Sequence, residues 1–227
     1  MATIIFSLGG SLLFKNNRID YKYIAEFTRF LKDMHLKGYK FGVVTGGGSI
    51  AREYISAASH FGATKVALDE LAISITKSNA RLVSLALGDL AYPNEVLDID
   101  TAVLAIKEGY IPVMGGMVAG MTTDADAALL AESLNAHFIN LTDVAGIYSG
   151  DPSQGVFDLY THLSPEQLLN LAKEHDSRDP GVHFPLDLFA CEIIRRSRIK
   201  TYVVDGRDLN NVKNILYMQP FKGTRID

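Results

Sequence analysis

Short apolar runs alternate along the chain with longer segments in which apolar residues recur every three or four positions. The runs have the length and the β-branched and aromatic content of buried strands. They occupy residues 3–8, 41–44, 111–114, 138–141 and 201–204. Between them, spacing such as that of Ile24, Phe27 and Leu31 is typical of an amphipathic helix. The alternation predicts an α/β fold with a mainly parallel central sheet that helices cover on both faces.

Polar cap residues and glycines bound the predicted helices. A longer helical segment is expected from Leu68 to Leu87, and residues 142–161 and 174–183 are expected to be a loop and a mobile connection. The other helices are expected to begin at or just after Asp20, Ser49, Asp98 or Asp100, one of Thr122, Thr123 and Asp124, Ser164-Pro165, Asp187, and Asp208. No repeat, low-complexity tract or linker divides the chain, so a single domain over residues 1–227 is predicted.

Three of the predicted strands stop at consecutive glycines. Gly9-Gly10 follows the first strand, Gly46-Gly47-Gly48 the second and Gly115-Gly116 the third. Glycine lets the backbone turn sharply and approach a ligand closely, and a helix that starts there directs free N–H groups at the gap. Ligands of parallel sheets bind outside the carboxyl ends of the strands. The pattern therefore predicts a phosphate site built from several strand ends.

Other interpretations of these glycines stay open at this point. Any one pair could be a simple turn. The chain has no G-x-x-x-x-G-K-[ST] motif, which excludes a Walker-type loop. Gly46-x-Gly48-x-x-Ala51 matches the variant dinucleotide fingerprint, with Asp69 at about the right distance for a ribose contact. That fingerprint normally occupies the first strand–helix turn, however, and it leaves Gly9-Gly10 and Gly115-Gly116 unexplained.

Composition narrows the classes of function. The 227 residues are 48% hydrophobic and 21% charged, which is ordinary for a soluble protein with a sizeable core. A net charge of −4 argues against nucleic acid as a partner, and no apolar run reaches the ~20 residues of a membrane span. Cys191 is the only cysteine, so no disulfide can form within the chain, and its thiol is expected to be buried. A chain without disulfides fits a reducing compartment, and a cytoplasmic location is predicted. No metal site is expected from the scattered residues His60, His137, His162 and His183.

Four motifs together resemble the amino acid kinase superfamily and, within it, the archaeal type of uridylate kinase. They are Gly9–Ser11, Gly46–Arg52, Gly116–Asp124 and Thr142–Pro152. Arg52 favours this branch, because relatives that phosphorylate isopentenyl phosphate usually carry a histidine near this turn. The resemblance runs nearly end to end and implies a three-layer α/β/α sandwich, the amino acid kinase fold.

The resemblance also implies an activity: transfer of the γ-phosphoryl group of ATP to UMP, giving UDP and ADP, in pyrimidine nucleotide biosynthesis towards CTP. The implied ATP-binding residues are Ser7, Leu8, Gly9, Gly10, Ser11, Gly48, Arg52, Thr142, Asp143, Tyr148 and Asp151. The implied UMP-binding residues are Gly46, Gly47, Asp69, Gly116, Met117, Val118, Ala119, Gly120, Met121, Thr122 and Thr123. A homohexamer made of dimers packed through helices is implied as well.

Phosphoryl transfer depends on in-line positioning and charge neutralisation. Arg52 and Asp124 are the predicted catalytic residues: Arg52 would contact phosphate, and Asp124 would orient cationic groups or Mg²⁺ carried with ATP. Asp124 could instead be only an acid in the first turn of a helix. Asp69 and Tyr148 likewise have simple alternatives, as a solvated helix residue and a half-buried aromatic.

The chain departs from the family pattern at several positions. Many relatives carry Asn and Asp where this chain has Asp143 and Ala145, and bacterial relatives have a phosphate-binding lysine at the position of Ser7. Glu192 stands where relatives tend to place a lysine that reaches the transferred group. We expect Glu192 to face solvent or to pair with Arg195 or Arg196 at helical spacing.

Alternatives to a UMP kinase remain at this point. The same fold could serve another acceptor, such as isopentenyl phosphate, acetylglutamate or carbamate. Glu192 raises the possibility of a non-catalytic nucleotide-binding protein. An NAD-linked oxidoreductase built on Gly46-x-Gly48-x-x-Ala51 is a more remote alternative.

Overall fold

The computed structural model describes residues 2–150, 157–176 and 184–227. The predicted ATP-binding residue Asp151, His183 and most of the predicted connection at 174–183 lie outside the described residues. Within these ranges, one seven-stranded sheet has the order β5-β4-β1-β6-β8-β9-β7. Its strands are β1 (Thr3–Leu8), β4 (Lys40–Thr45), β5 (Val113–Met114), β6 (His137–Thr142), β7 (His162–Leu163), β8 (Thr201–Asp205) and β9 (Thr224–Ile226).

The five strands from β5 to β8 in that order are parallel, and β9 is antiparallel to β8. This confirms the predicted mainly parallel sheet. Two short strands, β2 (Phe14–Lys15) and β3 (Arg18–Ile19), form a hairpin separate from this sheet. The described helices are α1 (Gly10–Leu13), α2 (Tyr21–His35), α3 (Gly48–His60), α4 (Lys65–Leu87), α5 (Ile99–Lys107), α6 (Thr123–Ser133), α7 (Pro165–Asp176), α8 (Leu188–Ser197) and α9 (Leu209–Leu216), with a 3-10 turn at Gly88–Leu90.

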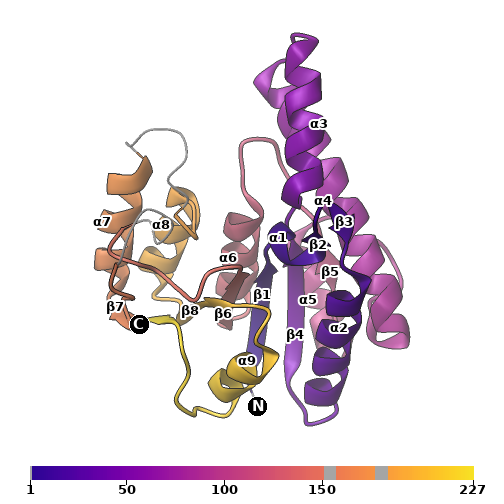
Figure 1. The fold of residues 1–227 in the computed structure, drawn as a ribbon. Helices are drawn as coiled ribbons and strands as arrows, with labels where there is room; N and C mark the ends of the chain where they lie inside the picture. The colour runs from indigo at the N-terminus through magenta and orange to yellow at the C-terminus, as the bar shows by residue number, and fades with distance from the viewer. Residues whose placement is uncertain (1, 151–156, 177–183) are drawn as a thin grey trace.

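Helices cover both faces of the sheet, which gives the three layers (Figure 1). Successive side chains of a strand point to opposite faces. Accordingly Ile4 and Phe6 of β1 pack with α2, α4 and α9, whereas Ile5 packs with α5, α6, α7 and α8. Cys191 is buried in the second of these two core clusters, as predicted.

Most of the predicted helix starts are confirmed by side-chain caps. Asp20, Asp98, Thr122, Asp187 and Asp208 each accept a hydrogen bond from a backbone N–H in the first turn of the helix that follows. Short side chains with an oxygen are favoured there because they satisfy donors that the helix itself leaves free.

The prediction that Ser49 caps α3 is wrong. The helix already begins at Gly48, so Ser49 lies inside its first turn, and its hydroxyl is buried with no hydrogen-bond partner among the described residues. Likewise α4 begins at Lys65 rather than Leu68, because Thr64 caps it by accepting from the N–H of Ala67.

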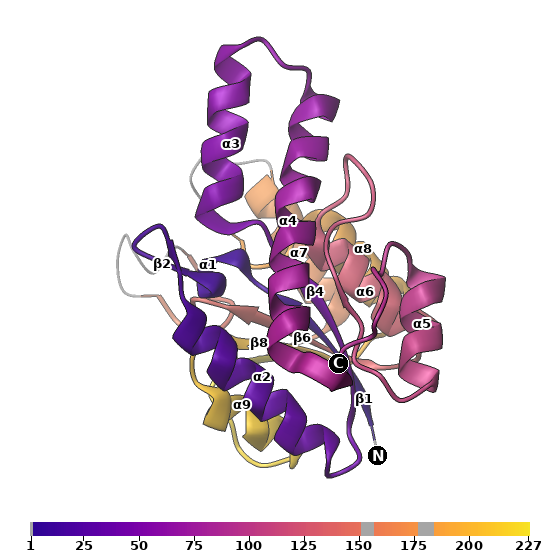
Figure 2. The same ribbon diagram turned by 90° about the vertical axis from the view of Figure 1, so that its right-hand side faces the viewer.

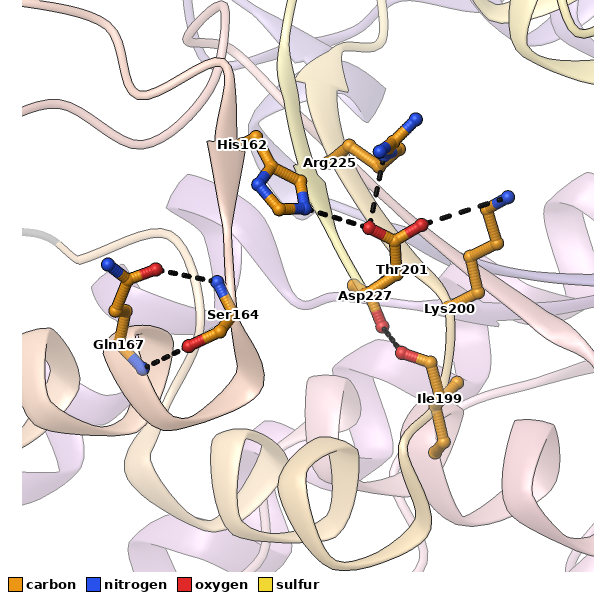
Figure 3. A network of polar contacts seen from close by, with 8 residues as sticks. All are labelled: His162, Ser164, Gln167, Ile199, Lys200, Thr201, Arg225 and Asp227. Atoms are coloured by element: carbon orange, nitrogen blue, oxygen red, sulfur yellow. Dashed lines mark hydrogen bonds and ion pairs between the residues drawn. The ribbon is translucent and has the colours of Figure 1, made fainter.

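The far edge of the sheet, with β7 and β9, is a region that sequence periodicity did not predict. The carboxylate of Asp227 lies 2.9 Å from Nε2 of His162 and 3.1 Å from Nε of Arg225 (Figure 3). In the same view, Ser164 and Gln167 exchange hydrogen bonds of 2.8 and 3.1 Å at the start of α7. This reciprocal capping box explains why a helix begins at Ser164-Pro165, as predicted.

Two long helices, α3 and the first half of α4, extend together as a hairpin beyond the rest of the molecule (Figures 1 and 2). Only Ala51 of α3 is buried, and apolar side chains such as Tyr54, Phe61 and Val66 are exposed on the hairpin. Among the described residues, no helix combines the length and the apolar character needed to cross a membrane.

Candidate active site

The glycine turns meet at one edge of the sheet. In the parallel register Leu8 of β1 lies opposite Thr45 of β4 and Leu141 of β6, and Val44 lies opposite Met114 of β5. The turns that follow these residues therefore start side by side. We call them the Gly10 corner (Gly9–Ser11), the Gly48 corner (Gly46–Gly48) and the Gly116 corner (Gly115–Gly116).

The first two corners are in direct backbone contact. A Cβ on Gly10 would lie 2.0 Å from the amide nitrogen of Gly48, and a Cβ on Gly46 would lie 2.8 Å from the amide nitrogen of Gly10. Asn79 of α4 supports this arrangement by donating to the carbonyl of Gly46 at 2.8 Å. Only residues without a side chain permit so close an approach.

The two helices that start from these corners lack a side-chain cap at their N-termini. The N-terminal residues of α1 and α3 follow Gly9 and Gly47, and no side chain caps either helix. Every other α-helix in the described ranges has a side chain that accepts a first-turn N–H. Two uncapped helix N-termini in contact present free N–H groups and positive dipole ends to a common gap, which suits an anion such as phosphate.

The Gly116 corner joins the same edge through α4. A Cβ on Gly115 would lie 2.5 Å from the amide nitrogen of Lys77, and the N–H of Gly116 donates to Oγ1 of Thr76 at 2.8 Å. The hydroxyl of Thr45, at the end of β4, in turn donates to the carbonyl of Thr76 at 2.9 Å. The three corners are thus adjacent, as the phosphate-site hypothesis requires.

A loop begins within the Gly116 corner and runs to the start of α6; we call it the acceptor loop (Gly116–Thr123). The N–H of Met117 donates to Oδ2 of Asp126 at 3.1 Å, and the N–H of Gly120 donates to Oδ2 of Asp69 at 2.9 Å. Thr122, which caps α6, also donates its hydroxyl to Oδ2 of Asp187. The loop therefore faces α4 on one side and the start of α8 on the other.

A buried polar cluster lies beneath the Gly10 corner. The hydroxyl of Ser7 donates to Oδ1 of Asp124 at 2.5 Å, and Nδ2 of Asn140 donates to the same oxygen at 3.0 Å. Ser7 and Asn140 come from the neighbouring strands β1 and β6 and are 2% and 3% exposed. No described group hydrogen-bonds to Oδ2 of Asp124, so this oxygen is available to a bound cation.

Burial changes the acidity of the carboxyl groups around this cluster. It raises the pKa of Asp124 to about 7, with a further contribution from the charge of Asp187 and an opposing one from the Ser7 hydrogen bond. Burial also raises the pKa of Asp126 to about 6, against the hydrogen bond from Met117. Carboxyl groups with perturbed pKa values are typical of functional sites.

The other predicted site residues differ in how they relate to the glycine corners. Arg52, one turn into α3, is exposed and has no hydrogen bond or ion pair with a described residue. Thr142 ends β6 beside the Gly10 corner, since a Cβ on Gly9 would lie 3.7 Å from its Cα, and Asp143 follows it at the surface. Tyr148 is half-buried at a bridge to Leu159, and no hydrogen bond connects it to the corners in the described ranges.

Glu192 is paired with two neighbouring cations. Its Oε2 accepts from Nε and Nη2 of Arg195 at 3.2 and 3.1 Å, and its Oε1 lies 3.9 Å from Nζ of Lys173. The expected pairing with an arginine at helical spacing is confirmed. The negative charge of Glu192 is therefore offset by Arg195 and Lys173.

Sequence reasoning missed four residues of this region: Thr76, Asp126, Asn140 and Arg207. Asn140 could have been found, because an amide inside the apolar run 138–141 needs a buried partner. Arg207 follows β8 and donates to the carbonyl of Ser11 at 3.2 Å. Its position depends on the order of the strands, which the sequence pattern does not give.

The chain matches known proteins over nearly its whole length. The sequence profile of the amino acid kinase family covers residues 2–205. A uridylate kinase from Haloquadratum walsbyi is 37% identical over 225 residues, 98% of this chain and 92% of that protein. One from Methanospirillum hungatei is 40% identical over 228 residues, 100% of this chain and 95% of that protein.

A solved structure adds a match in three dimensions. The crystal structure of uridylate kinase from Archaeoglobus fulgidus superposes with a TM-score of 0.85 at 38% identity and covers all of both chains. The profile, the relatives and the shared fold agree with the glycine corners described above. The chain therefore belongs to the amino acid kinase family.

Proposed function

We propose that this protein is a UMP kinase, which transfers the γ-phosphoryl group of ATP to UMP and releases UDP and ADP. The observation that carries the proposal is the contact between two uncapped helix N-termini at Gly10 and Gly48, directly above the Ser7–Asp124–Asn140 cluster. The activity named for the relatives supports UMP as the acceptor.

The glycine corners and the acceptor loop provide one site for each of the two substrates. The Gly10 corner and Gly48 would hold the phosphates of ATP, and the acceptor loop with Gly46, Gly47 and Asp69 would hold UMP. An oxygen of the UMP phosphate then attacks the γ-phosphorus in line, a P–O bond forms, and the bond to the β–γ bridging oxygen breaks. Since this reaction needs positioning and charge stabilisation more than covalent catalysis, fixed N–H groups and Arg52 are appropriate catalytic elements.

Mg²⁺ carried with ATP fits the residues present. No group of three or more His, Cys, Asp or Glu side chains in the described ranges could hold a metal by itself. In kinases Mg²⁺ is typically bound by one or two carboxylates together with phosphate oxygens and water, and Oδ2 of Asp124 can supply one such ligand. The ion would neutralise phosphate charge, while Ser7 and Asn140 fix the orientation of the Asp124 carboxyl.

A coupled assay tests the proposal. UDP formation is measured from UMP, ATP and Mg²⁺, beside CMP, isopentenyl phosphate, acetylglutamate and carbamate as acceptors. UMP should give the highest kcat/KM by at least about tenfold, since discrimination by polar contacts is large. Higher turnover with another acceptor would contradict the proposal, and tight UMP binding without turnover would indicate a non-catalytic protein.

Replacing Arg52 should impair catalysis without affecting stability. Because Arg52 is exposed and has no partner among the described residues, Arg52→Ala should leave the thermal midpoint within about 1 °C of that of the wild type. Loss of a charge-assisted contact to phosphate should lower kcat/KM by about 10- to 100-fold, with partial recovery in Arg52→Lys. The neighbouring exposed residue Glu53 offers a matched control, because Glu53→Ala should change neither quantity. Full activity of Arg52→Ala would contradict the assigned role.

We also propose a homohexamer that acts in the cytoplasm, in pyrimidine nucleotide biosynthesis towards CTP. The exposed apolar side chains on the α3–α4 hairpin support packing of copies through helices. Sedimentation equilibrium should then give a mass six times the 24.9 kDa of the chain. Substitution of the exposed Phe61 by Ser should shift the mass towards smaller species if this hairpin is the contact, and an unchanged hexamer would place the contact elsewhere.

A further inference from the structure

Asp126 is a buried carboxyl group that the proposed chemistry does not use. It is fully inaccessible in the first turn of α6, between Ala125 and Ala127. Its Oδ2 accepts the N–H of Met117 at 3.1 Å, and its Oδ1 is buried with no hydrogen-bond partner among the described residues. A half-satisfied carboxyl group normally costs stability, so a purely structural role would be served better by an apolar residue.

The contact that Asp126 does make is to the acceptor loop. Three side chains outside the loop accept N–H groups from it: Thr76 from Gly116, Asp126 from Met117 and Asp69 from Gly120. Thr76 and Asp126 are buried and belong to the packed part of the molecule, whereas the contact with Asp69 lies at the surface. Asp126 therefore connects the beginning of the loop to the helix that the loop itself leads into.

This connection fixes the loop from two directions. Thr122 begins α6 by capping it, and Asp126 lies one turn further along the same helix and reaches back to Met117. The segment from Met117 to Thr122 is thereby closed onto its own helix. A hydrogen bond to a charged acceptor is about twice as strong as one between neutral groups, so a carboxylate is well suited to this closure.

We propose that Asp126 is a positioning residue for acceptor binding, which holds the acceptor loop in its binding-competent conformation through the N–H of Met117. The inference rests on the proposed function in so far as the acceptor is UMP. Asp126 does not contact the reacting groups in this proposal. It raises the fraction of molecules whose loop is ready to bind, and the apparent affinity for the acceptor is proportional to that fraction.

Two substitutions separate this role from a structural one. Asp126→Ala removes the acceptor oxygen and suits the alanine-rich helix, whereas Asp126→Asn keeps an oxygen that can accept from Met117. In D126A the KM for UMP should rise about tenfold, with the KM for ATP and the kcat within about twofold of the wild type. D126N should recover most of that loss. The thermal midpoint of D126A should be equal to or higher than that of the wild type, because an unsatisfied buried carboxyl group is removed.

Amide hydrogen exchange on the free protein gives a readout that does not depend on activity. The amide of Met117 should exchange at least about tenfold faster in D126A than in the wild type, and D126N should lie close to the wild type. Thr28 supplies a matched control: its hydroxyl is buried in α2 and bonded to the carbonyl of Ile24, so Thr28→Ala removes a buried polar group without contact to the loop. T28A should leave loop exchange and the KM for UMP unchanged.

Several results would overturn the proposal: unchanged exchange of the Met117 amide in D126A, equal increases in both KM values with a lower thermal midpoint, failure of D126A to fold, or a D126N protein as impaired as D126A. If the wild type proves unable to phosphorylate UMP, the proposed function fails by itself. The exchange experiment then still decides whether Asp126 holds the loop.

Discussion

Gly10→Ala is expected to lower kcat/KM for the kinase reaction by about 10²- to 10³-fold. The new Cβ would lie 2.0 Å from the nitrogen and 2.5 Å from the Cα of Gly48, and 2.9 Å from the carbonyl carbon of Gly47. Since all three are backbone atoms, no side-chain rotation can relieve the overlap, and the Gly10 and Gly48 corners must separate. Overpacking of this kind typically costs about 1–3 kcal/mol, so the thermal midpoint should fall by several degrees as well.

A glycine outside the site provides the control for this experiment. Gly62 has a φ of +75°, and a Cβ added to it would meet nothing within 4 Å, so Gly62→Ala introduces backbone strain without a clash. It should cost about 1 kcal/mol of stability and leave kcat/KM unchanged. The proposed donor site would be contradicted if G10A folded and retained the activity of G62A.

The sequence predicted those parts of the fold in which a single local feature, such as an apolar run or a polar cap residue, determines the structure. Apolar runs such as residues 138–141 became central strands because only a strand buried on both faces accommodates them. Helix starts were predictable where a single polar side chain follows a strand or loop, as with Asp98 and Asp187. The short strand β9 was not predictable, because three residues carry too little periodicity and its position depends on pairing with β8 and β7.

The backbone part of the site was predictable for a related reason. Glycines at the carboxyl ends of parallel strands lie along one edge of the sheet whatever the order of the strands, so the corners at Gly10, Gly48 and Gly116 could be assigned to one edge without coordinates. Their direct contact depends on the strand order β5-β4-β1, which the structure supplies. Ser49 was predicted wrongly because the glycine turn starts the helix at Gly48, two residues earlier than a cap at Ser49 would.

The side-chain part of the site was only partly predictable. The contact between Ser7 and Asp124 joins residues 117 positions apart, and neither residue reveals its partner in the sequence. Asp126 was missed because an acid in the first turn of a helix is normally explained by the helix dipole alone. Its burial, and the N–H of Met117 that it accepts, depend on how the acceptor loop folds back onto α6.

Asp124→Asn is expected to lower kcat by about 100-fold at pH 8 and to make the protein more stable. The amide oxygen of asparagine can still accept from Ser7 and Asn140, so packing beneath the Gly10 corner is retained. The negative charge that would orient Mg²⁺ and other cationic groups is lost, however. Removing one group that stabilises charge in a transition state typically costs about 10²- to 10³-fold in kcat.

The effect on stability follows from the raised pKa of Asp124. An unfolded aspartate has a pKa of 3.8, whereas burial holds the pKa of Asp124 at about 7 in the folded protein. Between these values the unfolded state releases its proton before the folded state does, so this carboxyl group lowers the free energy of unfolding as the pH rises from about 4 to about 7. Above pH 7 both states are ionised and the loss stays constant.

Asparagine removes this pH-dependent loss because it does not ionise. The thermal midpoint of D124N should therefore equal that of the wild type near pH 4 and exceed it by roughly 10 °C at pH 8, because a pKa raised from 3.8 to about 7 corresponds to about 4 kcal/mol. Thermal unfolding at both pH values, together with kcat at pH 8, provides the test. Equal thermal midpoints of D124N and the wild type at pH 8 would mean that ionisation of Asp124 does not lower the stability of the folded protein. Full activity would mean that its charge has no part in the reaction. If D124N is more stable than the wild type only at the pH at which Asp124 is ionised, and has lost turnover at that pH, the ionised carboxyl group lowers stability and is needed for catalysis. The folded protein would then retain an unfavourable charge because the reaction requires it.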